Sequence, residues 1–359
     1  MSYRIAIIGV GAIANIHAKA IGDLANAELV GGCCRTTSKG REFSEKFGCP
    51  WYEDYGQMLD EQKPDVVTIT TPSGAHLDPV LACAERGIHV LCEKPLEITS
   101  ERIDQMIEVA RRSDIRLGGI FPQRYNAVVQ TLHRAAKQGR FGQVASINCY
   151  VPWWREDAYY SPDRWQGTVR FDGGGALINQ SIHGVDAVQW IGAAANSGDP
   201  AVNPVAQVFA FTDKRGHDPQ LIEVEDTATV VLKFRSGALG QILASTAMYP
   251  GSLKRIQVAG RDGTAEVLED ELITWQFRES LDEDESIRKR FGAKTATGGG
   301  AADPMAIDYS HHTRNIADFL DALDQGRSFL LDGPEARKAV VIIEAIYESA
   351  RIGQVVTLR

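Results

Sequence analysis

The stretch RIAIIGVGAIA, residues 4–14, decides the fold. An apolar run is followed by the turn Gly9-Val10-Gly11-Ala12-Ile13-Ala14 and then by a helical pattern. In a G-x-G-x-x-A turn the first glycine permits the tight turn, and the second lets the backbone approach a pyrophosphate at the helix N-terminus. An ordinary glycine-rich turn is the alternative. Because this turn joins a strand to a helix, we predict that it binds a dinucleotide through Gly9, Gly11, Ala12 and Ile13.

The rest of the first third alternates short apolar runs with amphipathic stretches. The expected strands are residues 4–9, 27–34, 66–70, 88–92 and 116–120, and the expected helices are residues 12–26, 38–47, 76–86 and 99–113. Several of the runs lack polar alternation, which is typical of parallel strands covered on both faces. This rhythm predicts an α/β fold that begins with a Rossmann domain, a doubly wound parallel sheet, over residues 1–122.

A different pattern follows over residues 123–359, the expected second domain. Runs such as QVASINCYV (143–151), TATVVLKF (227–234), LGQILAST (239–246) and KRIQVAG (254–260) alternate more clearly and are separated by turns. They predict an α+β domain with a large, mostly antiparallel sheet. One face of such a sheet often becomes a subunit interface, so a homodimer or homotetramer is expected. The acidic, glycine-rich stretch 282–300 predicts a mobile surface loop.

Composition excludes several classes of function. The 359 residues include 38 Lys+Arg and 47 Asp+Glu, a formal net charge of −9, which argues against nucleic acid as a partner. There is no apolar run long enough to span a bilayer and no signal-peptide pattern. The six cysteines lack metal-type spacing, so no metal site is expected. Unpaired thiols indicate a reducing compartment, and we expect a cytoplasmic protein without a membrane partner.

The end of the second expected strand bears on the choice of cofactor. An acidic residue that binds the ribose is usual about 20 residues after the glycine turn. Here that place holds Cys34, followed by Arg35-Thr36-Thr37-Ser38-Lys39. Basic and hydroxyl side chains suit a 2′-phosphate, so Arg35, Thr36 and Ser38 favour NADP. Stacking of Arg35 on adenine would instead be compatible with NAD.

Two further motifs follow expected strands, and a third opens a helix. Thr71-Pro72-Ser73-Gly74-Ala75-His76 and Glu93-Lys94-Pro95 lie at carboxyl ends of strands, where open α/β sheets bind ligands. The segment DGGGALINQSIHGVD, residues 172–186, places Asn179 and His183 four residues apart, on one helix face. A solvated turn and a structural histidine are the alternatives for each motif taken alone.

Together these motifs resemble the Gfo/Idh/MocA family of oxidoreductases. The resemblance runs nearly end to end, through GVGAIANIHAKA (9–20), TPSGAH (71–76), CEKPL (92–96), GRFG (139–142), the segment 164–190, and the segments 312–323 and 345–358. It implies a Rossmann domain followed by a mostly antiparallel α/β domain. It also implies that Lys94 is the catalytic lysine, that Glu93 faces the cofactor and that His183 meets the substrate hydroxyl.

One position departs from many relatives, which carry an aspartate where this chain has Asn179. An amide cannot accept a proton as a carboxylate does, but it can hold a substrate hydroxyl. Acid–base work therefore falls to Lys94 and His183. Arg124 is expected at the cofactor, together with Thr71, Pro72, His76, Glu93 and Lys94. The residues expected at the substrate are Lys94, Arg124, Tyr160, Arg164, Trp165, Asn179, His183 and His312. Packing in the interior is the alternative for several of them, as it is for the neighbouring Trp153, Trp154, Arg155 and Tyr159.

The expected activity is hydride transfer between NAD(P) and a secondary alcohol or ketone of a sugar, sugar acid or polyol. Aromatic faces with polar tips suit carbohydrate rings. Two alternatives share the fold. An NAD-dependent glycosidase would use transient oxidation and elimination, and a non-catalytic nucleotide sensor would need neither Lys94 nor His183.

Overall fold

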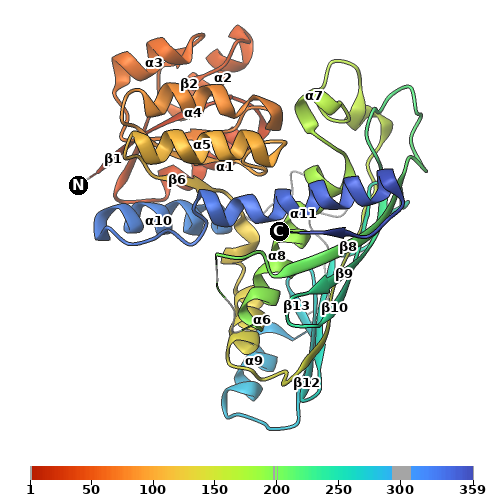
Figure 1. The fold of residues 1–359 in the computed structure, drawn as a ribbon. Helices are drawn as coiled ribbons and strands as arrows, with labels where there is room; N and C mark the ends of the chain where they lie inside the picture. The colour runs from red at the N-terminus through yellow and green to blue at the C-terminus, as the bar shows by residue number, and fades with distance from the viewer. Residues whose placement is uncertain (1, 197–198, 200, 293–308, 359) are drawn as a thin grey trace. The chain divides into compact units, whose positions relative to one another are not determined.

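The structure, a computed structural model, describes residues 2–196, 199, 201–292 and 309–358. The chain packs into two compact units, each built from separate stretches of sequence (Figure 1). The first comprises Met1–Tyr125, Arg170–Gly173 and Asp308–Arg337. The second comprises Asn126–Val169, Gly174–Ile307 and Lys338–Arg359.

The first unit contains a six-stranded parallel sheet with the strand order β3-β2-β1-β4-β5-β6. This order confirms the predicted Rossmann fold. Its strands are β1 (Tyr3–Ile8), β2 (Ala27–Cys33), β3 (Trp51–Tyr52), β4 (Val66–Ile69), β5 (His89–Cys92) and β6 (Leu117–Gly119). Its helices are α1 (Ala12–Gly22), α2 (Thr37–Phe47), α3 (Tyr55–Gln62), α4 (Leu77–Ala84), α5 (Ser100–Arg112) and α10 (Ser310–Gln325), with short turns η1 (Ser73–Ala75) and η2 (Pro122–Tyr125).

Local sequence explains where these helices start. The side chain of Asp54 accepts a hydrogen bond from the backbone N–H of Gln57, and the side chain of Thr99 accepts one from that of Arg102. Such N-caps satisfy backbone donors that the first turn of a helix leaves unpaired. The apolar faces of the helices then cover the sheet, in which β4 is fully buried and β1 is buried from Ile5 to Ile8.

The second unit contains an eight-stranded sheet with the order β13-β12-β11-β7-β10-β9-β8-β14. Its neighbours pair antiparallel except β10 with β7, which confirms the predicted mostly antiparallel sheet. Its strands are β7 (Val144–Pro152), β8 (Val205–Asp213), β9 (Thr227–Phe234), β10 (Leu239–Ser245), β11 (Arg255–Gly260), β12 (Gly263–Leu268), β13 (Glu271–Phe277) and β14 (Val356–Thr357). Helix α8 (Ile182–Ala194) packs on β7, and helix α6 (Ala127–Lys137) packs on α8 (Figure 1).

The remaining elements are a 3-10 turn η3 (Asp157–Tyr160), a short helix α7 (Val169–Asp172), a π-helical turn η4 (Ala176–Ser181), and helices α9 (Glu283–Phe291) and α11 (Gly333–Ile352). The expectation of a loop over 282–300 is wrong at its start, because three acidic residues in the first turn of α9 and three basic ones in its last turn favour a helix. Residues 293–300 lie outside the described part of the chain. Within the described residues, we find no helix with the length and apolar character that crossing a membrane requires.

Candidate active site

The glycine turn after β1 is held against the end of β4. Gly9 has φ +104°, and a Cβ on it would lie 2.5 Å from the backbone nitrogen of Thr71. The hydroxyl of Thr70 donates to the carbonyl oxygen of Gly9 at 2.6 Å. Only glycine therefore fits at this position. β1 and β4 are the neighbours at which the strand order reverses, the place where such sheets bind ligands.

The second glycine of the turn has a different environment. A Cβ on Gly11 would meet no protein atom within 4 Å, so packing within the protein does not require glycine here. Gly11 and Ala12 are exposed, Ile13 is half-buried, and the first turn of α1 has no acidic residue. A pyrophosphate needs close approach to such a backbone and a helix N-terminus free of negative charge. The turn therefore fits the phosphates of a dinucleotide.

The residues expected at the adenosine end surround the start of α2. Arg35, Thr36 and Ser38 are exposed, and Thr36 is the N-cap residue. The indole N–H of Trp51 donates to the carbonyl of Cys34 at 3.0 Å, which fixes the backbone before them. Exposed hydroxyl and guanidinium groups here suit either a ribose or its 2′-phosphate.

The loop after β4 is tied to the Glu-Lys-Pro corner through His76. Its Nδ1 lies 3.0 Å from the carbonyl oxygen of Pro95, and its Nε2 lies 2.9 Å from that of Thr71. His76 is 1% exposed, so its contacts are with backbone, whereas Thr71 and Pro72 are half-buried. The side chain thus joins two loops that both lie at carboxyl ends of neighbouring strands.

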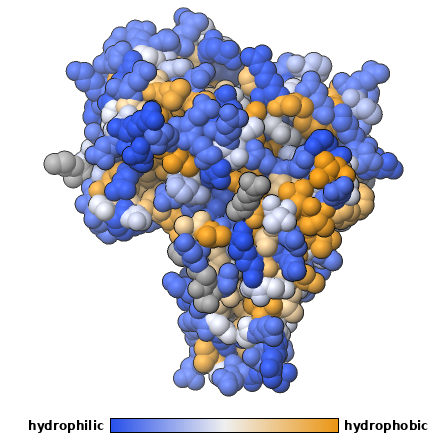
Figure 2. Space-filling view, viewed as in Figure 1, coloured by the Kyte–Doolittle hydropathy of each residue, from blue (hydrophilic) through white to orange (hydrophobic). Residues whose placement is uncertain are grey.

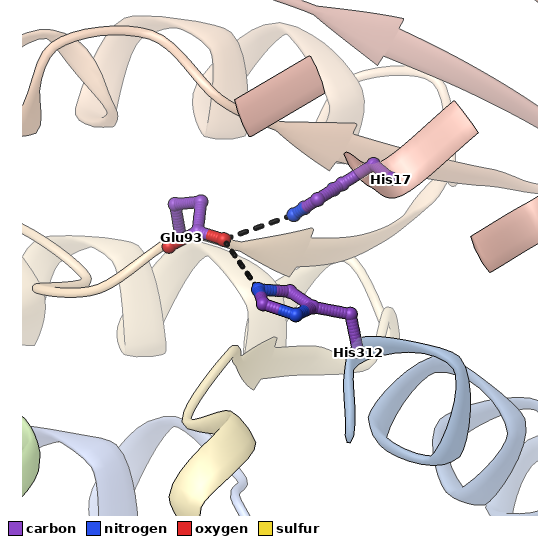
Figure 3. A group of neighbouring side chains, drawn as sticks. All are labelled: His17, Glu93 and His312. Atoms are coloured by element: carbon purple, nitrogen blue, oxygen red, sulfur yellow. Dashed lines mark hydrogen bonds and ion pairs between the residues drawn. The ribbon is translucent and has the colours of Figure 1, made fainter. Parts of the chain in front are cut away.

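Glu93 is buried at the end of β5 with both oxygens engaged. Its Oε1 lies 2.9 Å from Nε2 of His17 on α1 (Figure 3). Its Oε2 accepts the backbone N–H of Lys94 at 3.1 Å. Burial alone would raise the pKa of Glu93, but the hydrogen bond from His17 and the nearby positive groups outweigh it and lower the pKa to about 2. Lys94 itself is half-buried, and the Lys94-Pro95 bond is cis.

Two other residues predicted in this unit are buried. His312, on α10, has its Nε2 3.9 Å from Oε1 of Glu93, and burial lowers the pKa of His312 to about 4. Arg124 is 1% exposed, and its guanidinium donates to Oε1 of Glu335 at 2.7 Å. The structure therefore brings His312 to the Glu93 corner and pairs Arg124 with an acidic partner on α11.

In the second unit, the predicted helix face around Asn179 begins as a π-turn. Asn179 lies in η4 and His183 in α8, so the two residues belong to consecutive helical segments of different pitch. The amide of Gln180 donates to Oδ1 of Asn179 at 2.9 Å and to the hydroxyl of Tyr159 at 2.8 Å. Its oxygen accepts from Arg155 at 2.8 Å. Asn179 thus belongs to a polar network, while His183 is half-buried.

The glycines before the π-turn are required by close packing. A Cβ on Gly174 would overlap the hydroxyl of Tyr347, and one on Gly175 would overlap the carbonyl oxygen of Glu225. The carboxylate of Glu225 accepts the backbone N–H groups of Gly175 and Leu177, each at 2.9 Å, and the Tyr347 hydroxyl at 3.1 Å. Burial raises the pKa of Glu225 to about 7, although these hydrogen bonds oppose the rise.

The remaining predicted residues of this unit differ in exposure. Tyr160 is 5% exposed, its hydroxyl donates to Oγ1 of Thr246 at 2.9 Å, and its ring packs edge-on against His217. Arg164 is exposed beside the ring of Tyr159, and Trp165 is half-buried. Tyr160 is thus held in place by packing and by a hydrogen bond, whereas Arg164 and Trp165 are more exposed.

Three residues of these clusters were missing from the sequence-based prediction. His17 lies eight residues after the first glycine of the turn and carries no signal of its own. Gln180 stands beside Asn179 in the predicted motif and was readable as part of it. Glu225 is 50 residues from Gly175, whose backbone N–H its carboxylate accepts, so only the fold brings the two together.

Comparison with known proteins identifies the family of the chain. Residues 3–119 match the model of the Gfo/Idh/MocA oxidoreductase family with an NAD-binding Rossmann fold. Residues 129–266 match that of the Gfo/Idh/MocA C-terminal domain. Together the two models cover more than half of the chain and leave the segment after residue 266 outside their reach.

Individual relatives extend this match over the whole chain. Myo-inositol 2-dehydrogenase of Thermotoga maritima is 30% identical over 261 residues, which are 72% of this chain and 73% of the relative. The WlbA dehydrogenase of Chromobacterium violaceum, solved with NADH and UDP-GlcNAcA, is 32% identical with a TM-score of 0.86, covering 100% of this chain and 96% of that one. WlbA of Bordetella pertussis, solved with the same two ligands, is 29% identical with a TM-score of 0.85, covering 100% and 99%. The chain belongs to the Gfo/Idh/MocA oxidoreductase family.

Proposed function

We propose that the protein is a nicotinamide-dependent oxidoreductase that acts on a secondary alcohol or ketone of a carbohydrate. The observation that carries the proposal is that a dinucleotide-binding turn and a lysine lie at the same edge of the parallel sheet. A dinucleotide turn follows β1, and Lys94 follows β5, next to β4, with its backbone N–H bonded to a buried carboxylate. Membership of the oxidoreductase family supports this assignment.

The proposed chemistry divides between cofactor and protein. A nicotinamide bound at this site would supply hydride transfer, and the residues of the chain would supply orientation and proton transfer. In the oxidation direction, Lys94 takes the proton of the reacting hydroxyl, with His183 as the second acid–base group and Asn179 as a hydrogen-bonding partner of the substrate. In the reduction direction the same groups return the proton.

The residues proposed to hold the cofactor are those that surround its two ends. The pyrophosphate would bind at Gly9, Gly11, Ala12 and Ile13, and the adenosine would bind at Arg35, Thr36 and Ser38. The other residues proposed for the cofactor site of the first unit are Thr71, Pro72, His76, Glu93 and Arg124. Relatives of known structure contain NADH, whereas the exposed basic and hydroxyl groups at residues 35–39 suit NADP, so both cofactors belong in the test.

A carbohydrate with several hydroxyl groups is the proposed substrate class. The first candidates to test are inositols and nucleotide sugars. Relatives near 30% identity are a myo-inositol dehydrogenase and a dehydrogenase solved with UDP-GlcNAcA. Arg164, Trp165 and Asn179 offer a charge, an aromatic face and an amide for such a ligand, and Tyr160, His183 and His312 complete the proposed set.

Cofactor titration and a substrate screen test the proposal. NAD(H) and NADP(H) are titrated into the purified protein, and then myo-inositol, UDP-GlcNAcA, free sugars and sugar acids are screened for cofactor-linked absorbance change. We expect saturable binding of one cofactor and turnover with at least one carbohydrate. Aryl glycosides cleaved without net cofactor reduction would instead support a glycosidase. Cofactor binding with no turnover of either kind would favour a nucleotide sensor.

We also propose that the outer face of the eight-stranded sheet joins copies of the chain into a homodimer or homotetramer. Phe211 on β8, Val231 on β9 and Leu239 on β10 are 68%, 49% and 55% exposed. Figure 2 shows a group of hydrophobic side chains over the second unit, on a surface that is otherwise mainly hydrophilic. Exposed apolar side chains on adjacent strands are typical of a subunit interface.

The proposed compartment is the cytoplasm. All six cysteines are free thiols, and five of them are buried. Thiols of this kind persist in a reducing environment.

A further inference from the structure

The buried group His17, Glu93 and His312 joins three elements of the first unit. His17 comes from α1, Glu93 from the end of β5 and His312 from α10, and their side chains point toward one another (Figure 3). They are 0%, 7% and 4% exposed. Helix α10 packs against α1, which places the two imidazoles on either side of the carboxylate. Nothing in the proposed proton transfer uses this group directly.

Two histidines and a carboxylate whose ligand atoms lie within 4.8 Å of one another also suit a metal ion. Two observations argue for a hydrogen-bonded cluster instead. The atoms Nε2 of His17 and Oε1 of Glu93 are 2.9 Å apart, a direct hydrogen bond. The Nδ1 atoms of both histidines have no hydrogen-bond partner among the described residues, whereas a metal-bound histidine almost always donates its second ring N–H.

The cluster carries its negative charge on Glu93. The pKa of this carboxyl is lowered to about 2, and burial lowers the pKa of His312 to about 4, so near pH 7 the carboxylate is ionised and His312 is neutral. A buried carboxylate of this kind acts strongly on a nearby charge, because little water screens it. The next residue along the chain is Lys94, whose backbone N–H binds Oε2.

We propose that Glu93 is the positioning residue of Lys94: anchored by His17, its carboxylate fixes the Lys94 backbone and places a buried negative charge beside the lysine. The link also reaches the phosphate turn, because His17 lies on the helix that this turn opens. The inference rests on the proposed role of Lys94 as the acid–base group. It deepens that role by naming what sets the position and charge environment of the lysine.

The titratable groups around this carboxylate come from three elements. Helix α1 contributes His17, and helix α10 contributes His312 and, acting on it, His311. The end of β5 and the segment after it contribute Cys92 and Lys94. Glu97 is also fully buried, but it is paired with Arg102 at 2.8 Å and bonds the N–H of Ile98 at 2.6 Å. It is thus a matched control: a buried glutamate bonded to the next backbone N–H, whose charge a cation already balances.

The test measures the ionisation of Lys94 without any substrate. Intact protein is labelled with acetic anhydride over a range of pH, and mass spectrometry of the Lys94 peptide gives the midpoint of its reactivity. In Glu93→Gln, which keeps the shape and loses the charge, we expect the midpoint about one pH unit lower than in the wild type. In Glu97→Gln we expect no shift. An unchanged midpoint in Glu93→Gln, or an equal shift in Glu97→Gln, would overturn the proposal.

A second variant separates position from charge and covers a failure of Glu93→Gln to fold, which circular dichroism detects. Glu93→Asp keeps the charge, so we expect the reactivity midpoint of Lys94 in this variant to equal that of the wild type. The shorter side chain cannot bond both His17 and the Lys94 N–H, so hydrogen exchange at that amide becomes about fivefold faster. Unchanged exchange would contradict the positioning role. A stoichiometric metal in the purified protein that Glu93→Gln loses would also overturn the proposal.

These readouts do not depend on turnover. If the screen of substrates finds no oxidoreductase activity, the proposed function fails while the Lys94 titration still reports on Glu93. If turnover depends on Lys94 but the reactivity midpoint of Lys94 is the same in Glu93→Gln as in the wild type, the proposed function stands and this inference fails.

Discussion

The carboxylate of Glu225 accepts the backbone N–H of Gly175 at 2.9 Å, and the carbonyl oxygen of the same glutamate leaves no room for a side chain on that glycine. This contact positions the π-turn that carries Asn179. The glycine-rich entry is therefore a packing requirement of the second unit. In this it differs from the second glycine of the turn after β1, since a Cβ on Gly11 would meet no protein atom within 4 Å.

Replacing Gly175 with alanine tests that packing. We expect Gly175→Ala to lower the free energy of unfolding by about 1–3 kcal/mol, because the new Cβ forces the Glu225 backbone to move. Urea denaturation measures the change. Gly22→Ala is the control, since a Cβ there meets nothing within 4 Å in a helical conformation. It should be neutral or slightly stabilising. Equal losses in both variants would show that crowding at Gly175 is not the cause.

The raised pKa of Glu225 predicts a pH dependence of stability. Its folded-state pKa of about 7 lies above the ordinary value of 4.5, so the folded protein binds the proton more tightly than the unfolded chain. The contribution is fully present below pH 4.5 and is lost as the pH rises to about 7, on the order of 3 kcal/mol in all. Denaturation at a series of pH values measures it. Glu225→Gln should remove this part of the decline; a decline of the same size in the variant would contradict the assignment.

His217 and Asp226 form a buried ion pair, in which the group with the raised pKa is a histidine. Burial alone would lower the pKa of His217, but hydrogen bonds to Asp226 at 3.0 Å and to the carbonyl of Arg155 at 2.8 Å outweigh it and raise the pKa. The stabilisation is present below pH 6.5 and is lost as the pH rises through the raised value. Nuclear magnetic resonance titration of His217 should give a midpoint above 6.5, and Asp226→Asn should bring it down. A midpoint below 6.5 in the wild type would refute the pairing.

Structural features that depend on local sequence patterns could be predicted, whereas contacts between residues far apart in the sequence could not. Five strands of the first sheet were predictable, because parallel strands covered on both faces read as continuous apolar runs. Strand β3 was missed because two residues, Trp51 and Tyr52, show no period. The glycine turn and the Glu-Lys-Pro corner were readable as local motifs. Their positions at the same edge of the sheet, at the ends of β1 and β5 with β4 between them, follow from the strand order.

Contacts between distant segments were not readable. His312 was predicted near the substrate, and the structure places it 3.9 Å from Glu93, a residue more than 200 positions away. An amphipathic helix such as α10 reveals that one face is buried but not which helix covers it. The π-turn was also missed, since one additional residue in a helical turn leaves the apolar pattern around Asn179 nearly unchanged.

The proposed subunit interface predicts a change in assembly. Phe211→Asp places a charge on the most exposed apolar position of the outer sheet face, so we expect a shift toward monomer in light scattering after size exclusion. Val202→Asp, outside the strands, is the control and should keep the wild-type mass. A wild-type monomer, or an unchanged oligomer in Phe211→Asp, would count against the interface.

The central claim is that Lys94 performs acid–base chemistry beside a bound nicotinamide. Its most direct test is the turnover of Lys94→Met with the best substrate from the screen, together with NADH or NADPH binding by fluorescence. We predict that turnover falls by about 100-fold to 10,000-fold while cofactor affinity stays within a few fold. Lys137→Met, at an exposed site on α6, should match the wild type. Near-normal turnover of Lys94→Met with the cofactor bound would contradict the account.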